Sequence, residues 1–172
     1  MSKTAIASLT PETSKDAIHT GLKAAYRKEI ANDLSSILAA TYRLTIKSHV
    51  YHWNVVGPVF KSIHDLTEEH YNALFEATDI IAERIRALGH LAPVRFAMTE
   101  TFAPAKGDDV DQGSAHDMVN DLIAEHEQAV RDMRKAAAKA GDNDDMVTED
   151  MLTARLTFHE KALWMLRAVV AQ

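Results

Sequence analysis

Two short stretches of the sequence hold side chains of the kinds that bind metal ions. His64 is followed by Glu68 four residues later, and Asp79 is followed by Glu83 at the same spacing. A further imidazole, that of His52, precedes His64 by twelve residues. Residues four apart share one side of a helix, and imidazole nitrogens with carboxylate oxygens suit iron, manganese or zinc. The pattern therefore predicts a metal site built on helices.

The four potential ligands on the second helical stretch border an apolar stripe. At 100° per residue they fall within about 100° of one another around the helix, beside the stripe. The stripe consists of Phe60, Ile63, Tyr71, Leu74, Phe75, Ile81, Ala82 and Ile85. His52 likewise points to the apolar side of its own helix. Alone, His52 is more typical of a hydrogen-bonded core histidine than of a ligand. The acids alone are more typical of a solvated rim, but the combination favours ligands.

The distance along the helix limits where such a site can form. The His64/Glu68 pair and the Asp79/Glu83 pair are about 22 Å apart along the axis, so one metal cluster cannot be bound by both pairs of one chain. The sequence also lacks Glu-x-x-His, which supplies half of a di-iron site inside a carboxylate bundle. An antiparallel two-fold contact between second helices would bring the pairs together from two chains. The sequence therefore predicts a metal site between subunits.

Four stretches repeat apolar residues at helical spacing and predict the elements that carry these ligands. They run from about Ser14 or Gly21 to Asn54, from 60 to 88, from 114 to 140 and from 148 to 170. Ser114, with Asp117 three residues on, is expected to cap the third stretch, and Gly89 and Gly141 to end the second and third. The second and third are joined by a long segment, 89–113, whose middle, VRFAMTETF (94–102), fits one short helix. We expect an all-α, ferritin-like four-helix bundle over 21–172, with its second and third helices parallel, after a weakly basic tail at 1–20.

Composition restricts the class of protein. The 172 residues are 47% hydrophobic and 26% charged, typical of one soluble domain, and no run is apolar enough for a membrane helix. Cysteine is absent and the N-terminus has no signal-peptide core, so we expect a cytoplasmic protein. The net charge of −6 argues against a dedicated nucleic-acid binder, although the first 28 residues carry +3.

The motifs resemble those of a known family. The run KSHVYHWNVVGPVFKSIHDLTEEHY, the later TDIIAERIRALG and the C-terminal GDNDDMVTEDMLTARLTFHEKALWMLRA are similar to the sequence signature of the Dps family of mini-ferritins. The resemblance covers nearly the whole chain. It implies a hollow dodecamer that oxidises Fe(II), usually with hydrogen peroxide rather than dioxygen, and stores ferric mineral inside.

The resemblance also implies the role of each ligand. His52, His64 and Glu68 of one chain would bind iron together with Asp79 and Glu83 of the two-fold partner. Glu68 stands where many relatives have Asp, which bears on the second iron position. Beside this site, Trp53 is either a possible electron donor for stray oxidising equivalents or a core or interface aromatic. No organic cofactor is implied.

An acidic run precedes the last helix and has two interpretations. Asp142, Asp145 and Asp150 fit a solvated helix start, where acids favour the helix dipole. By resemblance they would instead line a three-fold pore through which Fe(II) is drawn inward. No metal role is expected for the remaining histidines considered, whose default is core or surface: His49, His70, His90, His116, His126 and His159.

Two other functions remain open at this point. Some relatives bind DNA through lysine-rich termini, and twelve copies of a weakly basic tail would add avidity, which would make this a nucleoid-associated DNA-condensing protein. Only Lys3 and Lys15 precede the first helical region, with Glu12 between them, and Gln172 ends the chain without a basic tail. The third possibility is a bundle that has lost ferroxidase activity, against which the full ligand set speaks.

Overall fold

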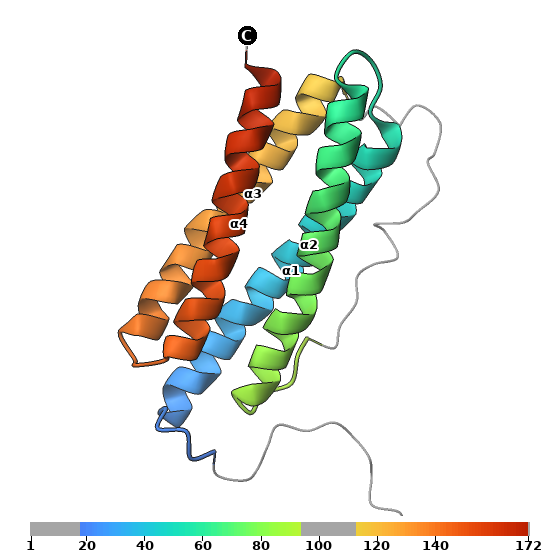
Figure 1. Cartoon of the computed structure of the whole chain (residues 1–172). Helices are drawn as coiled ribbons and strands as arrows, with labels where there is room; N and C mark the ends of the chain where they lie inside the picture. The colour runs from blue at the N-terminus through green and yellow to red at the C-terminus, as the bar shows by residue number, and fades with distance from the viewer. Residues whose placement is uncertain (1–17, 94–112, 172) are drawn as a thin grey trace, which may run out of the picture.

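Four long α-helices form the described part of the chain, residues 18–93 and 113–171 of a computed structural model (Figure 1). The helices are α1 (Ala24–Asn54), α2 (Phe60–Ala87), α3 (Ala115–Gly141) and α4 (Met146–Val170). No β-strand occurs in these two ranges, so the all-α prediction is confirmed. No helix within them is both long and apolar enough to span a membrane. The predicted short helix at 94–102 and most of the 1–20 tail lie outside the described residues.

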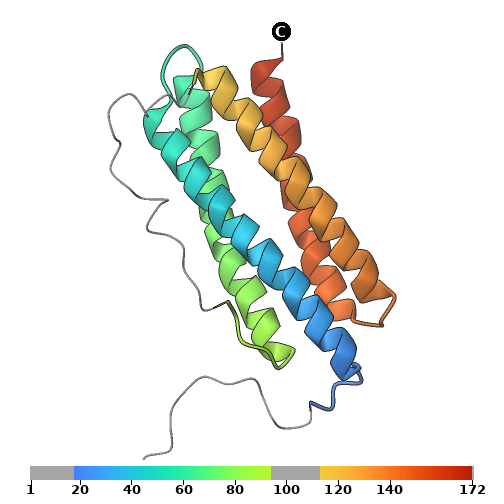
Figure 2. The same cartoon turned by 180° about the vertical axis from the view of Figure 1, so that it is seen from behind.

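The order of helix directions is that of a ferritin-like bundle. α1 and α2 run antiparallel as one hairpin, and α3 and α4 run antiparallel as a second (Figures 1 and 2). The hairpins meet through contacts of α1 with α3 and of α2 with α4. α2 ends and α3 begins at opposite ends of the bundle, so these two helices are parallel, as the sequence predicts.

Local signals explain where α2 and α3 end and begin. Beyond the end of α2, Gly89 adopts φ +90°, its amide donates to the carbonyl of Arg86, and the amide of His90 donates to that of Ile85. This is the glycine-terminated Schellman arrangement, which satisfies carbonyls that the helix leaves free. At the start of α3, Ser114 and Asp117 form the predicted cap as a reciprocal capping box.

The turn between α3 and α4 differs from the sequence prediction. Gly141 was expected to close α3 from outside, but it is the last helical residue, and Asp144 takes the left-handed conformation at φ +57°. Aspartate tolerates this region better than most residues. A Cβ on Gly141 would lie 2.9 Å from a side-chain oxygen of Glu149, a contact that this flexible, exposed side chain can relieve by moving.

The interior contains two apolar clusters, one toward each end of the bundle. One cluster includes Ile30, Leu34, Leu38, Ile81, Ile85, Met133 and Leu152. The other includes Leu44, Ile63, Leu66, Leu74, Val119, Leu122 and Leu166. Each side chain of this size stabilises the fold by roughly 1.5–3 kcal/mol when fully buried, and all four helices contribute to both clusters.

Three buried histidines interrupt this apolar interior. His70 on α2, His126 on α3 and His159 on α4 are almost completely shielded from solvent. Burial is the main cause that lowers the pKa of each imidazole. The neighbouring cations Lys161, near His70, and Arg155, near the other two, lower these pKa values further. The three rings are therefore neutral at pH 7.

We expect these histidines to make the fold acid-sensitive. As pH falls below about 6.5, these histidines bind protons in the unfolded chain but not in the folded chain. The free energy of unfolding therefore falls by up to about 1.4 kcal/mol per pH unit for each histidine. The variant His126→Leu/His159→Leu should show a clearly shallower loss between pH 7 and pH 5, measured as the free energy of urea unfolding. Replacing the exposed His116 by Gln should leave the dependence unchanged. An equally steep loss in the double variant would contradict this origin.

Candidate metal centre

His52 and His64 hold each other in a fixed orientation where α1 ends and α2 begins. Nδ1 of His52 lies 2.8 Å from the carbonyl oxygen of His64, and Nδ1 of His64 lies 2.9 Å from the carbonyl oxygen of His52. The rings stack with centroids 3.7 Å apart and planes 17° from parallel. Because a carbonyl only accepts hydrogen bonds, both Nδ1 atoms carry the proton, and each Nε2 keeps a lone pair for a metal ion.

The reciprocal bonds depend on the hairpin between α1 and α2. The segment between the helices includes Gly57 at φ +95°, a conformation that residues with a Cβ rarely adopt. Pro58 follows it in the sequence, just before α2. Bonds from the ring to a backbone carbonyl are the usual means of orienting a metal-binding histidine. The structure thus brings together two sequence-predicted candidates twelve residues apart.

The three candidate carboxylates lie on the exposed side of α2. Glu68 is one turn from His64, and Asp79 and Glu83 follow farther along the helix. None of the three makes a hydrogen bond or ion pair with another residue of 18–93 and 113–171. Because α2 is unbroken from Phe60 to Ala87, the two pairs stay about 22 Å apart along its axis. Within the described residues, no three acid or histidine side chains already gather around one point in a single chain.

The apolar stripe predicted on α2 divides into two parts. Ile63, Leu74, Ile81 and Ile85 are fully buried within the bundle. Phe60 and Phe75 are instead 43% and 62% exposed. An exposed apolar surface beside unpaired carboxylates is unusual for a surface in contact with water only. This side of α2 has the composition of a contact surface.

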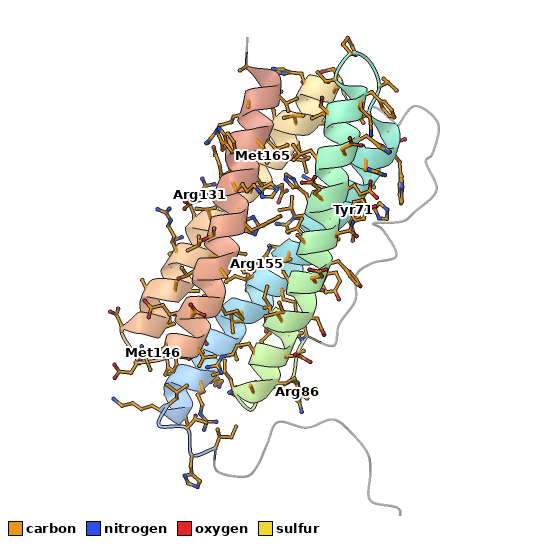
Figure 3. All side chains as sticks on the ribbon, viewed as in Figure 1. Tyr71, Arg86, Arg131, Met146, Arg155 and Met165 are labelled. Atoms are coloured by element: carbon orange, nitrogen blue, oxygen red, sulfur yellow. The ribbon has the colours of Figure 1, made fainter. Side chains whose placement is uncertain are left out.

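Aromatic rings connect the two histidines to the surface, a feature that the sequence analysis missed. Trp53, 56% exposed, has its ring centroid 4.1 Å from that of His49, and His49 stacks on Tyr71 at 4.3 Å. Tyr71 in turn lies edge-on to His52 at 5.4 Å, on the side of α2 away from α4 (Figure 3). The four-residue spacing of His49 and Trp53 was a usable signal, but the contribution of Tyr71 needs the α1–α2 packing.

Asp145 stabilises the fold through buried bonds, unlike Asp142 and Asp150, the other two acids proposed for a pore. Its side chain is buried; it receives a 2.6 Å ion-pair bond from Arg84 and further hydrogen bonds from Tyr26 and Thr148. Burial would raise the pKa of Asp145, but the bonds from Thr148 and Arg84 outweigh it and lower that pKa. The carboxylate also caps α4 by accepting from the amide of Thr148. Its oxygens are therefore committed within the chain.

Asp142 and Asp150 are exposed, as pore-lining acids would be. Asp150 and Glu83 both line a shallow groove of about 690 Å³ between α2 and α4. Arg84 lines the same groove and forms the ion pair with Asp145. The ion pair therefore fixes the C-terminal part of α2, which carries Glu83, against the start of α4.

Comparisons with known proteins agree with this architecture. The ferritin-like domain family model matches residues 31–172. A low temperature-induced protein of a Nostoc species is 40% identical over 89% of this chain and 86% of its own. The crystal structure of a Dps protein from Bacillus brevis superposes with TM-score 0.76 at 31% identity, over 87% of this chain and all of that chain. A Dps protein from Vibrio cholerae, described as belonging to the ferritin-like diiron-carboxylate superfamily, gives TM-score 0.78 at 26% identity, over 91% and 99%.

We expect Asp145→Ala to destabilise the protein by about 3 kcal/mol, because it leaves a largely buried Arg84 without its counter-charge and removes a helix cap. The matched change at the neighbouring exposed acid, Asp142→Ala, should alter stability by less than about 0.5 kcal/mol. The free energy of urea unfolding at neutral pH measures both. Equal effects of the two changes would show that the buried network contributes little.

Proposed function

Because this chain belongs to the Dps family of ferritin-like proteins, we propose that it is a ferroxidase that oxidises Fe(II) at sites between subunits and stores the ferric product in a hollow cage. The observation that carries the proposal is the reciprocal His52–His64 arrangement, which leaves two oriented Nε2 lone pairs beside unpaired carboxylates. Iron is the substrate and cargo of this activity.

The donor set suits iron by its chemistry. Imidazole nitrogens bind Fe(II), while carboxylate oxygens supply the negative charge that a ferric product requires. His52, His64 and Glu68 of one subunit would hold the ion together with Asp79 and Glu83 of its two-fold partner. Glu68 has a longer arm than the aspartate of many relatives and still reaches from the same edge of α2.

Two features support a site between subunits rather than within one. The rigid spacing along α2 prevents one chain from closing both ligand pairs on one ion. The exposed Phe60 and Phe75 provide apolar surface that a second α2 would bury. A two-fold contact is self-complementary, so each dimer would contain two identical sites. Family membership extends the proposed assembly to a dodecamer.

The proposed reaction balances with hydrogen peroxide as oxidant. Two Fe(II) ions give up one electron each, the peroxide O–O bond breaks, and two protons are taken up to form two waters. The locked imidazoles hold their protons at Nδ1 and contribute orientation rather than proton transfer. Dioxygen is the alternative oxidant. Trp53, through its contact with His49 and Tyr71, is placed to give an electron to an unpaired oxidising equivalent.

The proposal includes iron uptake through a pore lined by Asp142 and Asp150. Asp145 is left out of this pore, because its carboxylate already bonds Arg84 and Thr148 and stabilises the fold. DNA binding depends on the 1–17 segment, which is outside the described residues. In the proposed function, the protein therefore protects DNA by removing Fe(II) and peroxide. A cytoplasmic location follows from the same proposed role.

We expect Glu83→Gln to slow iron oxidation at least about tenfold, because the ferric product loses a charged ligand. Glu69→Gln, the matched change at an exposed acid that lies next to Glu68 but off the ligand edge, should keep the parental rate. Ferric absorbance after mixing Fe(II) with metal-free protein and peroxide measures both. Size-exclusion chromatography checks that both variants assemble. A parental rate in Glu83→Gln would remove this residue from the site.

Subunit mixing tests whether two chains share a site. His52→Ala/His64→Ala and Asp79→Asn/Glu83→Gln should each be inactive alone. Disassembled together and reassembled, they should recover about a quarter of the parental rate, since about half of random two-fold pairs are mixed and each mixed pair has one intact site. Each variant reassembled alone is the control. If mixing recovers nothing while mixed cages form, the ligands do not come from two subunits.

A further inference from the structure

The buried histidines of the interior form a cluster separate from the candidate metal centre. His70 is six residues from His64, which places it about 9 Å farther along α2 and about 120° around it. His126 and His159 come from α3 and α4, which contribute no ligand to the centre described above. The cluster therefore lies between three helices, on their inward faces, and involves none of the proposed iron ligands.

The hydrogen bonds of the cluster are incomplete. Nδ1 of His126 lies 2.9 Å from Nδ1 of His159, so one of the two atoms donates and the other accepts. Nε2 of both rings and Nδ1 of His70 are buried without a hydrogen-bond partner among the described residues. A buried polar atom without a partner costs about 1–3 kcal/mol. Three unpaired nitrogens on neighbouring rings are more than packing alone explains.

The spacing of the rings is close to that of imidazoles around a tetrahedral ion. Two nitrogens bound to one Zn²⁺ at about 2.0–2.1 Å are about 3.3 Å apart, and the ring centroids then lie about 5 Å apart. Here the two Nδ1 atoms are 2.9 Å apart. The ring centroids of His126 and His159 are 5.0 Å apart, and those of His70 and His126 are 5.4 Å apart. Opening the His126–His159 pair by a few tenths of an ångström admits an ion.

We propose that His70, His126 and His159 bind one divalent transition-metal ion of the zinc class inside each subunit. Within the described residues no three side chains are already arranged as ligands around one point, so the His70 ring must turn toward the other two on binding. The ion replaces the His126–His159 hydrogen bond with two coordination bonds. This proposal does not depend on the proposed ferroxidase function, because it uses different residues and a different part of the bundle.

The ligand chemistry selects the class of ion. Three neutral imidazoles without a carboxylate suit Zn²⁺, Co²⁺, Ni²⁺ or Cu²⁺, whereas Mg²⁺, Ca²⁺ and Mn²⁺ favour oxygen ligands. Burial lowers the pKa of each ring, which keeps the lone pairs available at neutral pH.

A neighbouring cation weakens the attraction and gives the proposal a second test. Arg155 on α4 lies on the side that faces α2 (Figure 3), with its guanidinium 4.6 Å from the Phe158 ring centroid. Its charge lowers the pKa of both His126 and His159, so it also opposes a bound dication. Glu76 is the acid that interacts with Arg155 and offsets part of this charge.

Cobalt titration of the full-length assembled protein tests the site, because Co²⁺ bound tetrahedrally by nitrogen absorbs visible light far more strongly than six-coordinate Co²⁺. The background variant His52→Ala/Glu83→Ala disables the candidate metal centre. In this background we expect one strongly absorbing Co²⁺ per chain after prolonged incubation, since buried ligands are reached by local opening. Adding His126→Leu/His159→Leu should abolish the band, and adding His116→Gln should preserve it.

Two further measurements, of Co²⁺ affinity in single variants and of stability with Zn²⁺, also test the site. His70→Gln, which keeps the two paired rings, should weaken Co²⁺ binding at least about tenfold, and Arg155→Met should tighten it. Zn²⁺ should raise the urea midpoint of the background variant but not of the one that also has both leucines. Absence of the Co²⁺ band in the background variant, or its persistence with both leucines, would overturn the proposal. If the protein with both leucines fails to fold, an unchanged Co²⁺ affinity in the His70→Gln variant would overturn the proposal instead.

Discussion

The rigidity of α2 is the constraint on which the candidate metal centre depends. A helix that runs unbroken from Phe60 to Ala87 fixes its two ligand pairs about 22 Å apart, and no side-chain rotation closes that gap. The inward face of this helix packs in the core, and its ligand edge lies beside exposed aromatic rings. In the proposed function, chemistry at that edge therefore requires a second subunit, so activity depends on assembly.

Periodicity and capping residues made most of the fold predictable. Helix ends at Gly89 and Ser114 follow from chemistry that acts within four residues, and both are observed. Prediction was weaker at the turn that follows α3. Gly141 was expected to end this helix from outside, but it is the last helical residue, and Asp144 takes the left-handed conformation. The local sequence does not show which of these two residues closes the turn.

The candidate sites show the same limit. His52 and His64 were identifiable by spacing, but the reciprocal Nδ1 bonds that orient them appear only with the hairpin in place. Within the acidic run, Asp145 looked like its neighbours, and only its buried partner Arg84, 61 positions away in the sequence, sets it apart. The buried His70, His126 and His159 lie on three helices and share no sequence pattern.

The two proposed metal sites of one subunit differ in their ligands. The interior site has imidazoles alone, and the site on the outer edge of α2 also has carboxylates. Oxidation of Fe(II) raises the charge of the ion, so the site that performs it needs anionic ligands, which only the outer edge of α2 provides. The interior cluster has neutral ligands and a nearby Arg155, which oppose a trivalent ion but tolerate a divalent ion that does not change charge. An ion held there would replace the single His126–His159 hydrogen bond, and the unpaired Nδ1 of His70, with coordination bonds and stabilise the subunit. Metal supply would then act on the stability of the cage from the inside, independently of the oxidation that takes place between its subunits.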